Sequence, residues 1–134
     1  IDREISAIAD AVIKELTAAG FVIQRYDAFS TNSIYLKLDY GLCNSIRKAI
    51  TGKKHLHYRY NLIKNHQIRK SKFPQGWDRY YYGFDHLDKM FKQISTDRQI
   101  KLRRYGKKYK SYMEANRVKN QNNAGFWSKC KEIT

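Results

Sequence analysis

The feature that most constrains the fold is a change in the spacing of apolar residues near residue 20. Residues 2–19 repeat apolar side chains every three or four positions, and Gly20 follows as a residue suited to end a helix. In "SIYLKLDYG" (33–41) the apolar side chains alternate with Tyr35, Lys37 and Asp39, which is typical of a strand with one buried face. The helix is expected to bury Ile5, Ile8, Ala9, Val12, Ile13 and Leu16.

Four strands are predicted in sequence order after the helix. The segments are "FVIQRYDAF" (21–29), residues 33–41, "CNSIRKAI" (43–50) and "KHLHYRYNLI" (54–63). Turn residues and the glycines at 41 and 52 separate them. The four strands are predicted to form an antiparallel meander that packs one face against the helices, which is an α+β fold.

The second half of the chain predicts a loop, a strand and two helices. Residues 64–78 lack a period and contain the single proline, so we expect a long basic loop, and "RYYYGF" (79–84) indicates a short fifth strand. Asp85 is expected to cap a first helix, and Thr96 and Asp97 to start a second. The apolar faces expected on the two helices comprise Leu87, Met90, Phe91 and Ile94, and Leu102, Tyr105, Tyr109, Tyr112 and Met113. Residues 1–119 are predicted to form one domain, and residues 120–134 a loosely ordered tail.

Composition narrows the class of protein. The 134 residues are 42% apolar, with no apolar run of transmembrane length and no signal-peptide order at the start, so we expect a soluble intracellular protein. Cys43 and Cys130 are too few for a disulfide framework and are expected to be reduced thiols.

The charge is +15 and is concentrated in two blocks. Residues 41–77 hold nine Lys and Arg and no Asp or Glu, and residues 98–134 hold eleven Lys and Arg against two Glu. Self-repulsion of this size opposes compaction, so a polyanionic partner, with nucleic acid first, is expected.

Two groups of cations are candidate nucleic-acid contacts. In "KHLHYRYNL" the two-residue period separates core positions from His55, His57 and Arg59, which would share an exposed sheet face with cations of neighbouring strands. The sheet group comprises Lys37, Arg47, Lys53, Lys54, His55, His57 and Arg59. The helix group comprises Lys101, Arg103, Arg104, Lys107 and Lys108. These like charges repel one another along the helix, and phosphates bound to them would offset that repulsion.

Two forms of chemistry remain as alternatives. His55 and His57 could hold a metal with His66, His86 or a cysteine, although this block has no acidic residue to complete a hydrolytic site. Either histidine could also act as acid or base in metal-independent cleavage of RNA. We expect no metal, no cofactor and no catalytic residue. The motifs of most other enzyme classes are missing.

The sequence resembles three groups of proteins. The order of helix, strands and helix is similar to the double-stranded-RNA-binding domain. "KELTAAGFVIQRY" resembles the mRNA interferase toxins of that fold, but "FSTNS" stands where the toxins carry their catalytic histidine. "STNSIYLKLDYG", "NSIR" and "GKKHLHYRYN" resemble small proteins of bacteriophages and bacterial mobile elements.

The last resemblance implies a setting in the cytoplasm of a bacterial host cell. The predicted function is non-catalytic binding of a phosphate backbone, of RNA or of protein-bound nucleic acid, by a phage or mobile-element accessory protein. The first alternative is an anti-defence inhibitor that docks on a host nucleoprotein complex, and the second is the metal-independent ribonuclease.

Overall fold

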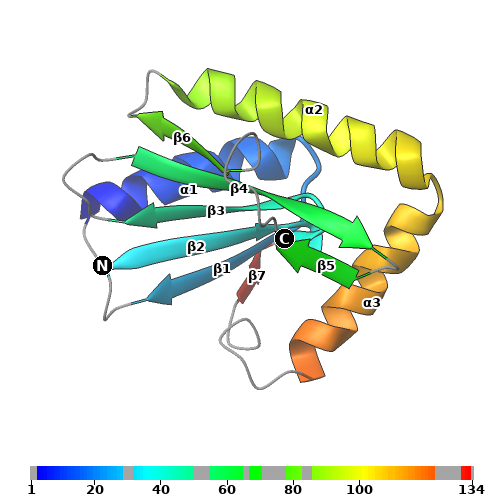
Figure 1. The fold of residues 1–134 in the computed structure, drawn as a ribbon. Helices are drawn as coiled ribbons and strands as arrows, with labels where there is room; N and C mark the ends of the chain where they lie inside the picture. The colour runs from blue at the N-terminus through cyan, green and yellow to red at the C-terminus, as the bar shows by residue number, and fades with distance from the viewer. Residues whose placement is uncertain are drawn as a thin grey trace.

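The computed structural model describes residues 3–28, 32–49, 55–64, 67–70, 78–82, 86–122 and 131–133. It confirms the α+β fold, with a helix before an antiparallel sheet and two helices after it (Figure 1). The elements in chain order are α1 (Arg3–Ala18), β1 (Ile23–Ala28), β2 (Ser33–Leu38), the 3-10 turn η1 (Asp39–Gly41), β3 (Asn44–Ala49), β4 (His55–Lys64), β5 (Gln67–Lys70), β6 (Asp78–Tyr82), α2 (Leu87–Tyr105), α3 (Lys108–Asn122) and β7 (Lys131–Ile133).

The sheet contains the predicted meander and extends it at both ends. The strand order is β5-β4-β3-β2-β1-β7, β6 also pairs with β4, and every pair is antiparallel. Two expectations are corrected, because β5 lies within the expected loop and β7 within the expected loose tail. Neither segment has an alternating apolar pattern from which a strand could be predicted. A short strand can pair through backbone hydrogen bonds alone once its partner strand is in place, so such a pattern is not required.

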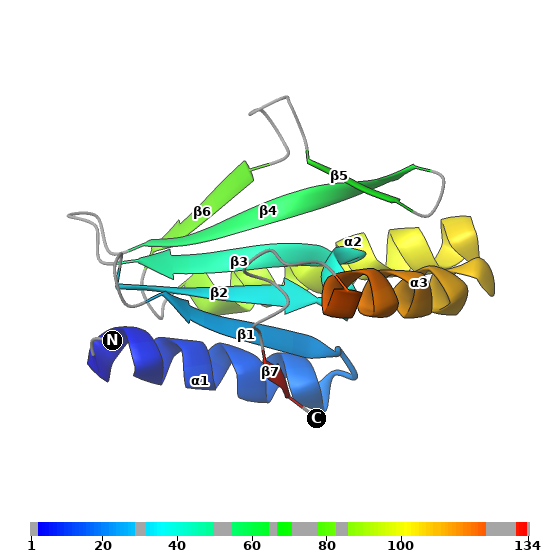
Figure 2. The ribbon, with the colours of Figure 1, turned by 90° about the horizontal axis from the view of Figure 1, so that it is seen from below.

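The core lies between one face of the sheet and the helices. All six positions predicted for the first helix are buried, and they share one cluster with side chains of the sheet such as Ile23 and Leu36. Leu87, Met90 and Ile94 of α2 join the same cluster, as expected. Figure 2 shows α1 on one side of the sheet, and among the described helices none lies across the other side. None of the described helices has the length and apolar character needed to cross a membrane.

The break between the last two helices differs from the prediction. No helix starts at Thr96 or Asp97, because α2 continues to Tyr105 and Gly106 then leaves helical geometry with φ 54° and ψ −130°. The Asp97 carboxylate does not cap a helix; it accepts a hydrogen bond of 2.6 Å from the Tyr58 hydroxyl. The predicted capping residue Asp85 lies outside the described residues.

Asp39 also differs from the prediction, since it belongs to the interior and not to the exposed side of the second strand. It is fully buried, and Asp39, Tyr40 and Gly41 all have positive φ. Its carboxylate accepts hydrogen bonds from Val22 N (3.0 Å), Arg98 Nε (2.8 Å) and Tyr109 Oη (2.7 Å). These contacts join the turn to α2 and α3, and they hold a backbone conformation that costs about 1–3 kcal/mol per residue outside glycine.

Candidate nucleic-acid interface

The sheet face opposite α1 collects polar and aromatic side chains from five strands. Because alternate residues of a strand share a face, the register places Tyr35 and Lys37 of β2 with Ser45 of β3, His57 and Arg59 of β4, and Tyr80 of β6. We call this set the outer sheet face: Tyr35, Lys37, Ser45, His57, Arg59, Tyr80, and also Tyr26 of β1 and Tyr82 of β6.

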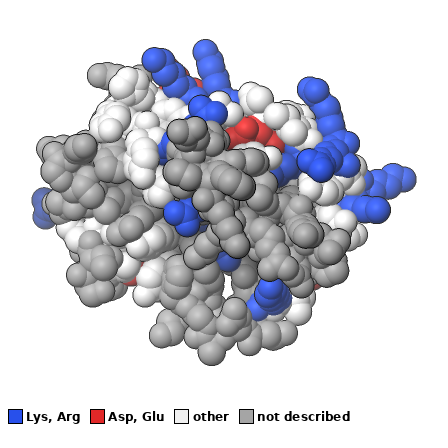
Figure 3. Space-filling view, in the orientation of Figure 1, with Lys and Arg blue, Asp and Glu red and all other residues white. Residues whose placement is uncertain are grey.

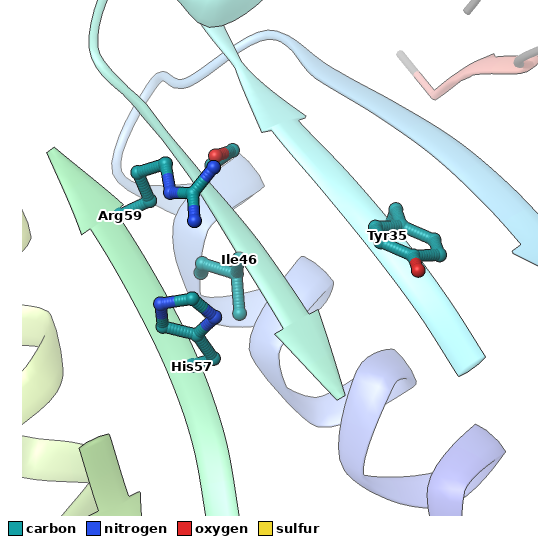
Figure 4. Close-up of a pocket in the computed structure, with 5 residues that line it drawn as sticks. Tyr35, Ile46, His57 and Arg59 are labelled. Carbon is teal, nitrogen blue, oxygen red and sulfur yellow. The ribbon is translucent and has the colours of Figure 1, made fainter. Parts of the chain in front are cut away.

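A pocket of about 150 Å³ lies on this face, lined by Tyr35, Ser45, Ile46, His57 and Arg59. Figure 4 shows His57 and Arg59 projecting from β4 toward β3, with Tyr35 lying over β2 on the other side of β3. A pocket of this volume has room for several water molecules or for a small anionic group. A cation, an imidazole and two hydroxyl groups therefore converge on one recess.

The register brings one more predicted cation to this place in the sheet. Arg47 is the partner of both Tyr35 and His57, and so occupies the β3 position between them. Its side chain lies outside the described part of the structure. Asp78 of β6 is the register partner of Arg59, and its side chain also lies outside the described part of the structure.

Aromatic rings border the pocket. The His57 and Tyr80 rings are stacked, with centroids 4.8 Å apart and planes at 14°, and the Tyr26 and Tyr35 rings lie 6.4 Å apart. Tyr80 is 52% exposed and Tyr82 is 47% exposed, although large aromatic side chains usually bury most of their surface. The outer sheet face therefore presents rings beside cations.

The structure brings three of the seven predicted sheet residues together with described side chains: Lys37, His57 and Arg59. His55 lies in β4, but its side chain, like that of Arg47, lies outside the described residues. Lys53 and Lys54 also lie outside them. Ser45, Tyr80 and Tyr82 were missed, and the alternation in "RYYYGF" could have placed Tyr80 and Tyr82 on one face.

The helix group divides into four exposed residues and one buried residue. Arg103, Arg104, Lys107 and Lys108 are exposed around the break between α2 and α3. In Figure 3 the blue lysine and arginine side chains gather along the upper and right-hand rim, over α2 and its junction with α3. These four residues are called the helix cations below.

Lys101 does not belong to a binding surface. It is 2% exposed, and its ammonium donates hydrogen bonds to the carbonyl oxygens of Leu42 (2.8 Å) and Cys43. The ammonium also lies 4.1 Å from the centre of the Tyr60 ring. Burial lowers the pKa of Lys101 to about 8. The prediction that Lys101 contacts nucleic acid is therefore wrong, because this residue lies on the side of α2 that faces the core.

Tyr60 lies where α2 approaches β4. Burial raises the pKa of Tyr60, and the charge of Arg104 acts in the opposite direction, so Arg104 lies within electrostatic reach of β4. Tyr60 follows Arg59 directly in that strand. Arg104 thus lies near the strand that carries His57 and Arg59, on its α2 side, whereas the Arg59 side chain points to the opposite face of the sheet.

The described residues offer little for covalent or metal chemistry. Cys43 is buried, and burial raises its pKa to about 12, so the thiol stays protonated at neutral pH. Within the described segments no three His, Cys, Asp or Glu side chains come close enough together to hold a metal ion. His57 and Arg59 in the pocket are the described groups suited to proton transfer and phosphate contact.

Comparison with protein-family models, with curated proteins and with solved structures finds no match to this chain.

Proposed function

We propose that this protein is a non-catalytic nucleic-acid-binding protein that contacts the phosphate backbone through the outer sheet face. The observation that carries the proposal is the pocket where Arg59 and His57 meet Tyr35, beside the exposed Tyr80, in a chain of net charge +15. Cations neutralise phosphates, and nearby rings offer stacking surfaces to bases, which are the two components of many nucleic-acid sites.

The helix cations support the same proposal. Arg104 lies within electrostatic reach of β4, so the field of this cation adds to that of Lys37 and Arg59 when a long polyanion passes along the sheet. A protein of a phage or mobile element that binds RNA or protein-bound nucleic acid fits such a surface. The combined field predicts fast association and a strong dependence on salt.

The test is a titration of fluorescently labelled RNA and DNA, followed by anisotropy at several salt concentrations. Arg59→Gln should weaken binding and reduce the slope of log K against log salt by about 0.7–0.9, which corresponds to one phosphate contact. Lys14→Gln is the matched control, because it removes the same charge from an exposed position on α1, the helix that packs on the other sheet face.

Two results would remove the proposal. One is the absence of binding at low salt, which would favour the alternative in which the protein docks on a host nucleoprotein complex. The other is an equal effect of Arg59→Gln and Lys14→Gln, which would show that only total charge matters.

The metal-independent ribonuclease is kept as a second candidate because His57 and Arg59 line the same pocket. The proposed function predicts that labelled RNA remains intact during prolonged incubation with or without divalent ions. Cleavage that is lost in His57→Ala, with the fold retained, would establish the ribonuclease instead.

A further inference from the structure

We infer that the outer sheet face is built for single-stranded nucleic acid, with at least one unpaired base stacked on Tyr80 while a neighbouring phosphate lies at Arg59. This inference rests on the proposed function and specifies its ligand. It follows from the arrangement of rings and cations on the face and from the spacing of the strands.

The exposed rings of the outer sheet face offer a surface on which an unpaired base can stack. Tyr80 leaves 52% of its surface exposed, and His57 packs flat against it with ring planes only 14° apart. The stack limits the orientations of both rings, so less conformational freedom is lost when a base binds. In a duplex the base faces are covered by neighbouring base pairs, and sugars and phosphates would meet these rings instead.

The spacing of the Tyr80 and Tyr82 rings suits an extended single strand. Tyr80 and Tyr82 lie two residues apart on β6, which is about 6.7 Å along a strand at about 3.3–3.4 Å per residue. Successive bases of a helical strand are separated by about 3.4 Å. Adjacent bases can therefore reach both rings only when the strand is extended and unstacked, as single strands can be.

The pocket lies directly beside the stacked rings. His57 both stacks on Tyr80 and lines the pocket that Arg59 and Ser45 complete, so the ring platform and the pocket share one side chain. A base on Tyr80 and a phosphate in the pocket would thus be close neighbours on one strand. The volume of the pocket is sufficient for an anion of about the size of a phosphate.

The experiment compares a labelled, non-pairing pyrimidine oligonucleotide with a duplex of the same length, at the same salt concentration. We expect the wild-type protein to bind the single strand at least about 5-fold more tightly than the duplex. Tyr80→Ala should weaken single-strand binding by about 5- to 100-fold, the range measured for loss of one base stack. Binding of the duplex should change less than about 2-fold.

Two variants separate stacking from charge and from folding. Tyr80→Phe keeps the ring and should keep single-strand affinity, so a loss in Tyr80→Ala alone identifies the ring face as the contact. Tyr80→Ala should leave the salt slope unchanged, whereas Arg59→Gln should lower it. If Tyr80→Ala fails to fold, the comparison of single strand with duplex in the wild-type protein still decides the inference.

The outcomes distinguish this inference from the proposed function. Equal or tighter binding of the duplex, or equal affinities of Tyr80→Ala and Tyr80→Phe, would overturn the single-strand inference and leave nucleic-acid binding in place. Binding of neither ligand at low salt would overturn both.

Discussion

Replacing Lys101 with methionine tests the conclusion that this residue holds the fold together and does not contact a ligand. Methionine keeps an unbranched chain but donates no hydrogen bond, so the carbonyl oxygens of Leu42 and Cys43 lose this donor. A lost partner costs about 1–3 kcal/mol per buried group, and removal of a buried charge offsets part of that sum. We expect the variant to be less stable by about 2–4 kcal/mol at neutral pH.

The pH dependence gives a sharper test, because the pKa of Lys101 falls from 10.5 to about 8 on folding. Above the folded pKa the native state loses its proton while the unfolded state keeps it, so the unfolded state binds more protons. The stability of the wild-type protein relative to Lys101→Met should therefore rise between about pH 8 and pH 10.5. The expected gain is about 1.3 kcal/mol from pH 7 to 9 and about 2.5 kcal/mol from pH 7 to 10.

The measurement is urea unfolding of both proteins at several pH values, with nucleic-acid binding measured on the same samples. Cys43, whose raised pKa lowers stability as pH rises above 9, is present in both proteins, so most of its contribution is common to both; the charge of Lys101 itself lowers the pKa of that thiol. Lys92→Met, an exposed position on the same helix, should change stability by less than about 0.5 kcal/mol at every pH.

Parallel stability curves for the wild type and Lys101→Met would refute the reasoning about the buried ammonium. If the salt dependence of nucleic-acid binding were weaker in Lys101→Met than in the wild type, Lys101 would be a contact residue for nucleic acid after all.

Three further predictions concern stability and are checked by chemical unfolding. Gly106→Ala should cost about 1–3 kcal/mol from backbone strain alone, because φ is 54° there and no atom lies within 4 Å of the added Cβ; no loss would show that the helix break has another geometry. Asp39→Asn should cost about 3–5 kcal/mol, since it breaks a buried ion pair with Arg98 and presents a donor to the Tyr109 hydroxyl, whereas the exposed Asp88→Asn should be nearly neutral. Tyr58→Phe should cost about 1–3 kcal/mol, because the buried Asp97 carboxylate loses a donor at 2.6 Å; equal stability would mean that Gln93 alone satisfies it.

Elements with a strong local period could be predicted from the sequence. The six core positions of α1 and the strand order β1 to β4 follow from apolar spacing, because a helix or strand must place a continuous apolar face on the core. The same alternation correctly separated Tyr58, which is buried, from His57 and Arg59. For this strand the face turned away from the core could therefore be chosen without a structure.

The sequence by itself determined the fold class, the charge and the faces of its periodic elements, because these depend on residues close together in the chain. Only the tertiary structure decided that Lys101 turns inward, since its two carbonyl acceptors lie 59 and 58 residues earlier. It likewise decided that Asp39 is buried and that His57 stacks on Tyr80 of a strand outside the meander. Such partners are set by strand register and helix packing, and no local period of the chain encodes which distant residue will satisfy a buried charge or pair with an exposed ring.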